Sequence, residues 1–174
     1  MAYINGKEVL FVVDHTNHLR KLAEGATKEI PADALRGATE IAFTAFAGWI
    51  NITSVELPDT VTRINTNAFH SCTGLTRVVI PASVAIIGQG AFYGCTGLTS
   101  VVIPTSVTSI SYNAFQGCTN LATLYMQRST PPTIQRNTFT GCDALIKIIV
   151  PAGCSSAYKT ATNWSAYADI ITEA

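Results

Sequence analysis

The stretch NAFHSC at residues 67–72 recurs as GAFYGC at 90–95, NAFQGC at 113–118 and NTFTGC at 137–142. The first three copies are 23 residues apart, and the fourth follows after 24. A period between about 20 and 50 residues indicates units that stack on their neighbours. A unit of this length cannot bury its own apolar face, but stacked copies can. The repeat therefore predicts a solenoid in which equivalent residues meet along one axis.

Each repeat also contains a predicted strand ahead of this motif. The strand is a run Leu-x-x-Val-x-Ile, rich in β-branched residues and in most copies followed by a proline, which does least harm at a strand end. A second apolar pair, such as Val84 with Ile87, predicts the return segment of the coil. The position before each Ala-Phe or Thr-Phe pair carries a residue type that tolerates a positive φ: Asn67, Gly90, Asn113 and Asn137.

The solenoid is predicted to occupy residues 29–151, as about five repeats and a final strand. Its first copy is degenerate, with Trp49 in place of the cysteine. The fold class is α/β or mostly β: a short right-handed solenoid of parallel strands, about 4.8 Å apart, capped at both ends. A column of phenylalanines should form the centre of its core: Phe46, Phe69, Phe92, Phe115 and Phe139.

The two ends of the chain are predicted to be caps, because a solenoid otherwise exposes its last coils. Residues 1–28 predict a hairpin around Asn5–Gly6, a strand over Val9–Asp14 and a helix over His15–Glu24. Residues 152–174 predict a short helix capped by Ser155 or Ser156. Three apolar residues after this helix should cover the final coil: Trp164, Tyr167 and Ile170.

The repeat resembles the BspA-type, or Treponema-type, leucine-rich repeat, whose pattern the chain follows closely from Ile52 to Pro151. The resemblance implies a curved leucine-rich-repeat solenoid with parallel strands on its concave side. It also implies a binding role, since members of the family are commonly surface or secreted proteins that attach to host matrix proteins or other cells. The tail VPAGCSSAYKTATNWSAYADII is similar to the closing segment of such bacterial proteins. The array is short, however, and no signal peptide is visible, so the localisation stays open.

Composition argues against several classes of function. Eleven basic and eleven acidic residues cancel, so no electrostatic attraction to nucleic acid or to an anionic membrane is expected. The longest apolar run, Val9–Val13, is far shorter than the roughly 20 residues that span a bilayer. Between Val78 and Gln127 there is no Asp, Glu, Lys, Arg or His, which disfavours acid–base catalysis there. We expect no enzyme, no catalytic residue and no cofactor.

Four cysteines share one position of the repeat: Cys72, Cys95, Cys118 and Cys142. Free thiols are the favoured interpretation, because buried cysteine packs as a small hydrophobe and stacked side chains point the same way. Disulfides are the alternative, since neighbouring coils bring Cα atoms within about 4.4–6.8 Å. A metal site is disfavoured for these cysteines. We interpret His15 and His18 as part of a solvent-exposed face of the cap rather than as metal ligands. His70 is interpreted as a surface residue.

Candidate binding residues lie at the outward positions of the strands. If the first, fourth and sixth positions of each run face the core, the fifth faces out and forms an apolar stripe, with a polar row at the third. Two alternatives stay open: β-branched residues suit any sheet face, or a neighbouring subunit covers the stripe. The predicted partner-binding residues are Arg77, Val79, Val102, Tyr125, Lys147 and Ile149.

The favoured function is a non-enzymatic module that binds a protein or glycan partner through its concave strand face. The alternative is a structural component, such as a phage or prophage virion accessory protein, in which the apolar stripe holds copies of the chain together. No nucleic acid and no membrane span are expected, and a homo-oligomer is left open.

Overall fold

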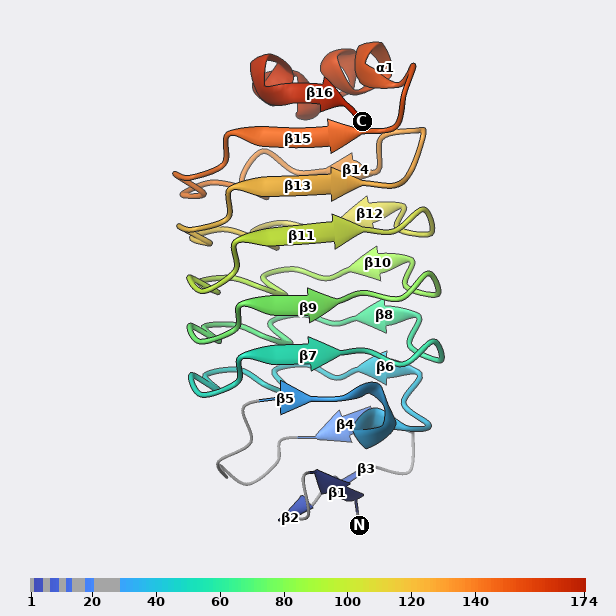
Figure 1. The fold of residues 1–174 in the computed structure, drawn as a ribbon, viewed down its shortest axis with the longest axis vertical. Coiled ribbons are helices and arrows are strands. Elements are labelled where there is room, and N and C mark those ends of the chain that lie inside the picture. Colours follow the sequence, from blue (N-terminus) through green and yellow to red (C-terminus); the bar gives the residue numbers. More distant parts are fainter. Residues whose placement is uncertain (1, 5–6, 10–11, 14–17, 21–28) are drawn as a thin grey trace.

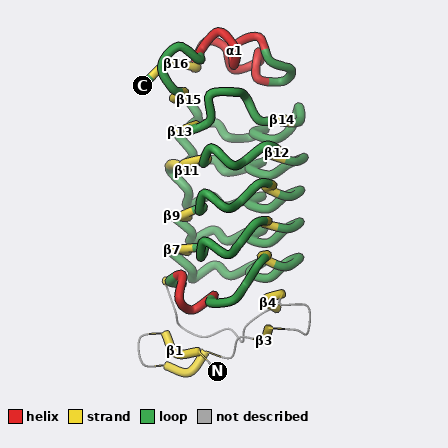
Figure 2. The backbone as a smooth tube through the Cα atoms, turned by 90° about the vertical axis from the view of Figure 1, so that its right-hand side faces the viewer, coloured by secondary structure: helices red, strands yellow, loops and turns green. Residues whose placement is uncertain are grey.

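The computed structural model describes residues 2–4, 7–9, 12–13, 18–20 and 29–174. The described chain winds into a column of stacked coils, with the N-terminus at one end and the C-terminus at the other (Figures 1 and 2). Each full coil gives one strand to a front layer and a shorter strand to a back layer. The predicted solenoid of parallel strands is confirmed.

The two layers differ in their continuity. The back layer is one sheet of seven strands. The front layer is two sheets, β5-β7-β9 and β11-β13-β15-β16. The front strands are β5 (Glu29–Ile30), β7 (Ser54–Glu56), β9 (Arg77–Val79), β11 (Ser100–Ile103), β13 (Thr123–Met126), β15 (Lys147–Val150) and β16 (Ile171–Glu173). The back strands are β3 (Val12–Val13), β4 (His18–Arg20), β6 (Glu40–Ile41), β8 (Arg63–Ile64), β10 (Ile86–Ile87), β12 (Ser109–Ile110) and β14 (Thr133–Ile134).

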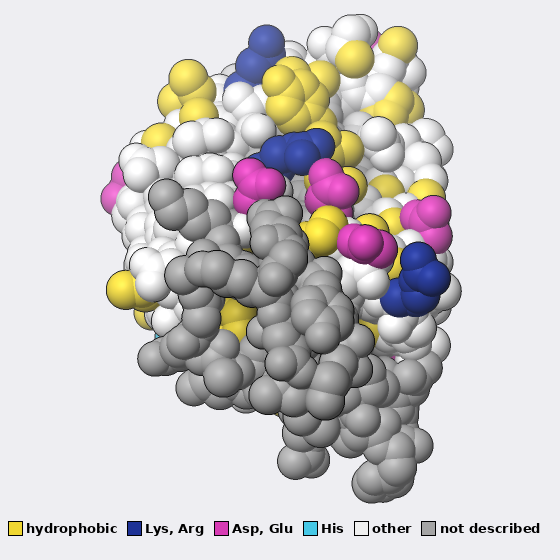
Figure 3. Space-filling model, turned by 60° about the horizontal axis from the view of Figure 1, so that its bottom comes forward, with side chains coloured by type: hydrophobic (Ala, Val, Ile, Leu, Met, Phe, Trp, Pro, Cys, Tyr) yellow, Lys and Arg dark blue, Asp and Glu magenta, His cyan; other side chains and the backbone are white. Residues whose placement is uncertain are grey.

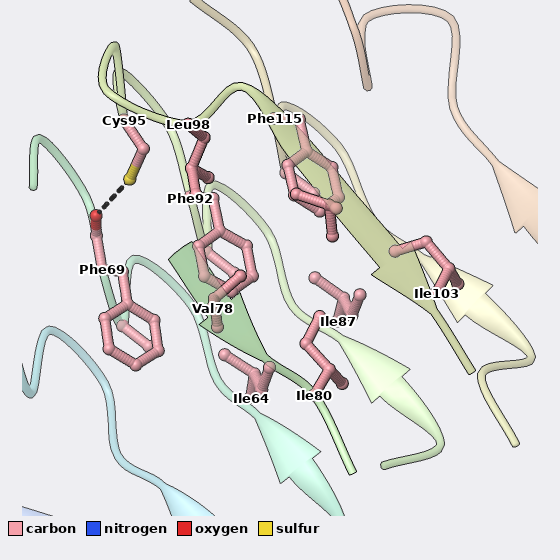
Figure 4. Packing of buried hydrophobic residues seen from close by; sticks show 14 of the residues in the cluster. Ile64, Phe69, Val78, Ile80, Ile87, Phe92, Cys95, Leu98, Ile103 and Phe115 are labelled. Carbon is pink, nitrogen blue, oxygen red and sulfur yellow. Dashed lines mark hydrogen bonds between the residues drawn. The ribbon is translucent and has the colours of Figure 1, made fainter. Parts of the chain in front are cut away.

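A phenylalanine ladder fills the space between the layers, as the sequence predicts. Its rings are stacked nearly parallel, with centroids 5.0 Å apart for Phe46–Phe69 and 5.2 Å for Phe69–Phe92. The Phe92–Phe115 pair is also at 5.2 Å, and Phe115–Phe139 is at 5.7 Å. All five rings are buried. Figure 4 shows Phe69, Phe92 and Phe115 among aliphatic residues of both layers. Because each ring contacts the next, the core is continuous along the column.

The cysteine column runs beside this ladder. All five cysteines of the chain are free. Each of the four stacked thiols donates a hydrogen bond to the carbonyl oxygen of the phenylalanine one coil earlier, as Cys95 does to Phe69 at 2.9 Å (Figure 4). The other Sγ–O distances are 3.0 Å for Cys72, 3.1 Å for Cys118 and 3.0 Å for Cys142. The thiols therefore connect neighbouring coils as well as filling the core.

The turn before the Ala-Phe pair adopts the predicted left-handed backbone in three of four repeats. The φ angles are +57° at Asn67, +59° at Gly90 and +58° at Asn113. The prediction is wrong for Asn137, whose φ is not positive. In this longer repeat the Thr138 hydroxyl accepts a hydrogen bond from the Gln135 N–H at 2.9 Å, so the turn closes in a different way.

The N-terminal segment is described only in part. Strands β1 (Ala2–Ile4) and β2 (Lys7–Val9) pair antiparallel with Ile4 opposite Lys7, as a hairpin requires; the turn itself lies outside the described residues. The predicted helix is wrong for His18–Arg20, which form β4 and pair in parallel with β6. A strand can hydrogen-bond to the edge of β6, as β4 does, whereas a helix uses its backbone groups within itself. The remainder of the predicted helix and the side chains of His15 and His18 lie outside the description.

The C-terminal segment packs over the last coil. Helix α1 (Ser155–Thr160) leads into the 3-10 helix η2 (Trp164–Ile170) and β16. Trp164 and Tyr167 contact the Phe139 ring, with centroid separations of 6.1 and 5.7 Å, as the apolar pattern predicts. A second 3-10 helix, η1 (Ala32–Leu35), lies in the first described coil. No helix among the described residues has the length and apolar character needed to cross a bilayer.

Three side chains fix the C-terminal segment to the longer fourth repeat. Trp164 donates from Nε1 to the Pro132 carbonyl at 2.7 Å, and Tyr158 from its hydroxyl to Arg128 at 2.8 Å. Asn163 donates from Nδ2 to the Ile134 carbonyl, also at 2.7 Å. Burial raises the pKa of Tyr158 to about 12, so this hydroxyl stays protonated and keeps its role as donor.

The predicted serine cap of α1 is wrong. Cys154 occupies the N-cap position and makes no side-chain capping bond. Instead the Glu173 carboxylate accepts hydrogen bonds from the N–H groups of Gly153 at 2.9 Å and Ser155 at 3.0 Å. A carboxylate near a helix N-terminus satisfies backbone donors and is favoured there by its charge. Glu173 comes from β16, so a long-range contact replaces the local cap.

Candidate interaction surface

The predicted binding residues lie on the outward side of the front layer. Val102 is level with Tyr125, and Tyr125 with Ile149, on the paired strands β11, β13 and β15. Val102 and Tyr125 expose 45% and 42% of their surface, whereas Ile149 is half-buried. Lys147 is exposed at the third position, level with Thr123. The structure therefore brings four of the six predicted residues onto one sheet.

The other two predicted residues lie on β9, in the second front sheet. Val79 is half-buried and level with Glu56 of β7. Arg77 is exposed, and its Nη1 lies 3.2 Å from Glu56 Oε1. These two side chains are 64% and 46% exposed. An ion pair as exposed as this one contributes about 0–1 kcal/mol to the stability of the fold. Figure 3 shows basic and acidic side chains close together on the face that it presents, near the N-terminal end, so the charge on this face is mixed.

A cleft separates the two front sheets. It has a volume of about 550 Å³ and lies between β9 and β11 (Figure 1 gives the places of the strands). Arg77, Val79 and Val102 line it, whereas Tyr125, Lys147 and Ile149 do not. The full lining is Thr76, Arg77, Val78, Val79, Ile80, Ala82, Thr99, Ser100, Val102, Pro104 and Gln127.

The β9 side of the cleft is a free strand edge. The Arg77 N–H donates to Thr53 at 3.2 Å, and the Val79 carbonyl accepts from Leu57 at 3.1 Å, so both residues face β7. Successive residues of a strand direct their backbone groups to opposite edges. The N–H and C=O groups of Val78 and Ile80 therefore face the cleft.

The β11 side is a free edge by the same argument. The carbonyls of Thr99 and Ile103 accept hydrogen bonds from the next coil, at 2.9 Å from Ala122 and 3.0 Å from Gln127. The backbone groups of Ser100 and Val102 consequently face β9. Across the described ranges no backbone hydrogen bond joins β9 to β11, and the two strands belong to different sheets. Two strand edges therefore confront each other without pairing.

Sequence reasoning missed this cleft and several of its residues. The runs that become β9 and β11 read LTRVVIP and LTSVVIP, so the sequence predicts the same stacking for both as for their neighbours. The core side chains Val78 and Ile80 are 7% and 8% exposed, whereas Val101 and Ile103 are 1% and 0% exposed. No residue type at these positions signals the difference.

The chemistry available elsewhere is limited. A side-chain hydrogen bond with Cys72 and burial raise the pKa of Cys95, so its thiol stays neutral and is a poor nucleophile. In the part of the chain that the structure covers, no group of three or more His, Cys, Asp or Glu residues could hold a metal ion. His70, predicted at the surface, is half-buried and stacks on Tyr93 with ring centroids 4.8 Å apart.

The repeating strand-and-return coil, with its Phe and Cys columns, defines a leucine-rich-repeat solenoid. Residues 39–167 match the family described as the BspA type leucine rich repeat region, in six copies. The chain belongs to this family. Membership indicates a protein-interaction or adhesion module, and the family is generally non-enzymatic. No protein of curated function matches the sequence.

Solved structures support the same fold. A leucine rich cell surface protein from Faecalibacterium prausnitzii A2-165 has a TM-score of 0.77 and 25% identity, over 92% of this chain and 41% of that chain. The leucine rich repeat protein of T. pallidum has a TM-score of 0.57 and 26% identity, over 81% and 78% of the two chains. The pneumococcal vaccine antigen PcpA, at 16% identity, has a TM-score of 0.61 over 97% and 46%. The chain spans less than half of the F. prausnitzii chain.

Proposed function

We propose that this protein is a non-enzymatic interaction module that binds a partner protein through its front layer. The supporting observation is the combination of an apolar, outward-facing row with a cleft on the same layer. Val102 and Tyr125 expose apolar surface on neighbouring strands. Val102 also lines the cleft, so the row and the cleft form one surface. Apolar surface beside a concave feature is typical of protein-binding sites.

The residues of this surface are those predicted from the repeat. Val79, Val102, Tyr125 and Ile149 supply the apolar part, and Arg77 and Lys147 lie beside them. The F. prausnitzii relative is a cell surface protein, which is compatible with attachment to an external partner. A protein is favoured over a glycan as the partner because the exposed side chains of the row, Val102 and Tyr125, are apolar or aromatic.

A matched pair of double variants tests the proposal. Val102→Glu with Tyr125→Glu places two charges on the front layer. Phe43→Glu with Tyr112→Glu is the control, because both residues are exposed, at 68% and 54%, and follow back-layer strands. Both proteins are screened against host matrix proteins, glycans and bacterial surface extracts, and their mass in solution is measured.

We expect the parent and the back-layer control to capture the same protein. The front-layer variant should bind that protein with an affinity lower by about tenfold or more. Equal capture by both variants would overturn the proposal. A defined oligomer that captures nothing, and that only the front-layer variant dissociates, would replace it with the structural role. Capture of a glycan alone would show that the partner is a glycan and not a protein.

A further inference from the structure

We propose that the cleft between β9 and β11 closes in a second conformation of the protein, in which the two strands pair and the front layer becomes one continuous sheet. A partner that contacts both sides of the cleft would favour this closed conformation. The closure follows from the geometry of the coils, whereas its role in binding rests on the proposed function.

The backbone groups on the two sides of the cleft match in register. In the neighbouring pair β7–β9, the Leu57 N–H donates to the Val79 carbonyl at 3.1 Å. One period of 23 residues later, the same pattern joins the Ile80 N–H to the Val102 carbonyl. In the described part of the chain this second bond is not formed. The donor and the acceptor that closure would join are therefore already present on the two edges.

The two strands are close enough to pair after a small movement. Cα atoms of β9 lie within 8 Å of Cα atoms of β11, whereas paired strands are about 4.8 Å apart. Closure therefore needs a shift of about 3 Å or less at the front of the coils. A separate strand between them would need about twice the spacing of a pair. The two edges can thus satisfy each other but cannot hold a further strand.

Contacts behind the cleft provide the axis of this movement. The Phe92 and Phe115 rings stack at 5.2 Å, and the Cys118 thiol donates to the Phe92 carbonyl at 3.1 Å. In the back layer β10 pairs with β12. These contacts hold the two coils together while the front is open, and closure leaves them intact. The front strands would therefore rotate toward each other about the core.

We expect the open and closed conformations to be close in free energy. Water can reach the unpaired backbone groups of the cleft, so pairing them exchanges one set of hydrogen bonds for another and gains little. Closure also covers Val78 and Ile80, which are 7% and 8% exposed, whereas Val101 and Ile103 on the paired strand are 1% and 0% exposed. This small gain opposes the entropy lost when the front strands are ordered.

Outward side chains connect the closure with binding. Val79 and Val102 belong to the predicted binding residues and line the cleft from its two sides. Closure makes them neighbours on one sheet, and the row then runs without a break from Val79 to Tyr125 and Ile149. A partner that covers both valines binds the closed conformation better. A ligand shifts such an equilibrium by its difference in affinity for the two states.

The first measurement is NMR of the whole chain without a ligand. We expect the N–H groups of Val78, Ile80 and Val102, which face the cleft, to exchange with solvent at least about tenfold faster than those of Val101 and Ile103, which face β13. Relaxation dispersion should show two exchanging conformations in β9 and β11 but not in β15. Equal protection of all five amides would mean that the strands are always paired. A flat dispersion profile in β9 and β11 would mean a single conformation, and either result overturns the proposal.

The second measurement uses a disulfide that holds the cleft closed. Val79→Cys with Val102→Cys joins positions one period apart on the two sides. Val102→Cys with Tyr125→Cys is the matched control, because these residues are already level on paired strands, where Cα separations suit a disulfide. Both variants also carry Cys154→Ala, since Cys154 is only half-buried, and both are oxidised with glutathione disulfide.

We expect both disulfides to form. Oxidation of the cleft variant should slow the exchange of the Val78 and Ile80 amides by about tenfold or more, and oxidation of the control should leave these amides unchanged. If only the control pair can be oxidised, or if the cleft disulfide forms without protecting the two amides, the strands do not pair and the proposal is overturned. The NMR measurement on the parent keeps the test valid if a double variant misfolds.

Binding by the cleft variant separates this inference from the proposed function. A protein captured through the front layer should bind the oxidised cleft variant about threefold or more tightly than the reduced form of the same variant. Equal binding by the two forms would overturn the role of closure in binding, while the proposed function stands. If the cleft closes but the two double-glutamate variants capture partners equally, the proposed function fails and the closure stands.

Discussion

Cys95 donates a hydrogen bond from its Sγ to the carbonyl oxygen of Phe69 over 2.9 Å, from one coil to the one before it. The same carbonyl also accepts the N–H of Cys72 at 3.2 Å, within its own coil. Each such carbonyl thus closes its own turn and connects to the next coil. This double role explains why the motif repeats a cysteine and not merely a small apolar residue.

Cys95→Ala is therefore expected to destabilise the protein. It removes a buried hydrogen bond and leaves a small cavity, which together should lower the free energy of unfolding by about 1–3 kcal/mol. Urea denaturation measures the change. Cys154→Ala is the control, because Cys154 is only half-buried and lies outside the column, and it should change the stability by about 0.5 kcal/mol or less. Equal effects of the two substitutions would contradict a structural role for the thiol column.

The reactivity of the thiols should follow their burial. A side-chain hydrogen bond with Cys142 and burial raise the pKa of Cys118, as the corresponding bond with Cys72 does for Cys95. A thiol reagent such as DTNB should modify Cys154 rapidly in the native protein and the four stacked cysteines only after denaturation. Mass spectrometry of the modified peptides checks the assignment. Rapid native modification of Cys95 or Cys118 would show that the column opens.

Phe92→Ala should be among the most destabilising substitutions, because Phe92 stacks on both Phe69 and Phe115 at 5.2 Å and is fully buried. Truncating a buried phenylalanine costs about 3–5 kcal/mol. Phe92→Leu keeps most of the volume and should cost less. Urea denaturation measures the free energy of unfolding of both variants. If Phe92→Ala lowers it no more than Phe92→Leu does, the rings do not form a continuous stack.

The pH dependence of stability should include a contribution from Glu173. Hydrogen bonds from the Ser155 side chain and from the backbone N–H groups of Gly153 and Ser155 lower its pKa from 4.5 to about 2. A depressed pKa stabilises the fold at pH values above 4.5, and this contribution disappears as the pH falls toward 2. Glu173→Gln should therefore be less stable than the parent at pH 7, and the difference should vanish near pH 2.

Urea midpoints of both proteins between pH 7 and pH 2 measure this effect. Asp169→Asn is the matched control, because Asp169 is an exposed carboxyl in the same C-terminal segment. A Glu173→Gln difference that is constant over the whole pH range would mean that the carboxylate charge has no part in holding α1.

How much the sequence could predict depends on whether a residue's neighbours are set by the repeat. Phe92 and Cys95 meet their equivalents one period away, so the ladder, the thiol column and the outward row at Val102 were all predictable. Glu173 reaches α1 from a strand 18 residues further on, a contact that no local pattern indicates. Strand β4 pairs with the edge of β6, and that edge exists only once the coil has formed.

The cleft was the least predictable feature. Strands β9 and β11 come from nearly identical runs, and the back layer continues without a break through β8, β10 and β12. The front layer differs from the back layer in the spacing between β9 and β11, and the repeat pattern carries no information about that spacing.

The C-terminal segment is attached to main-chain carbonyls of a single coil, through Tyr158, Asn163 and Trp164. This attachment bears on how such chains change during evolution. These contacts all fall within residues 128–134, in the one repeat that is a residue longer than the rest. Duplication or loss of a 23-residue unit upstream would leave them untouched. Copy number can therefore drift, lengthening or shortening the array and its exposed face, while the closing structure is inherited unaltered.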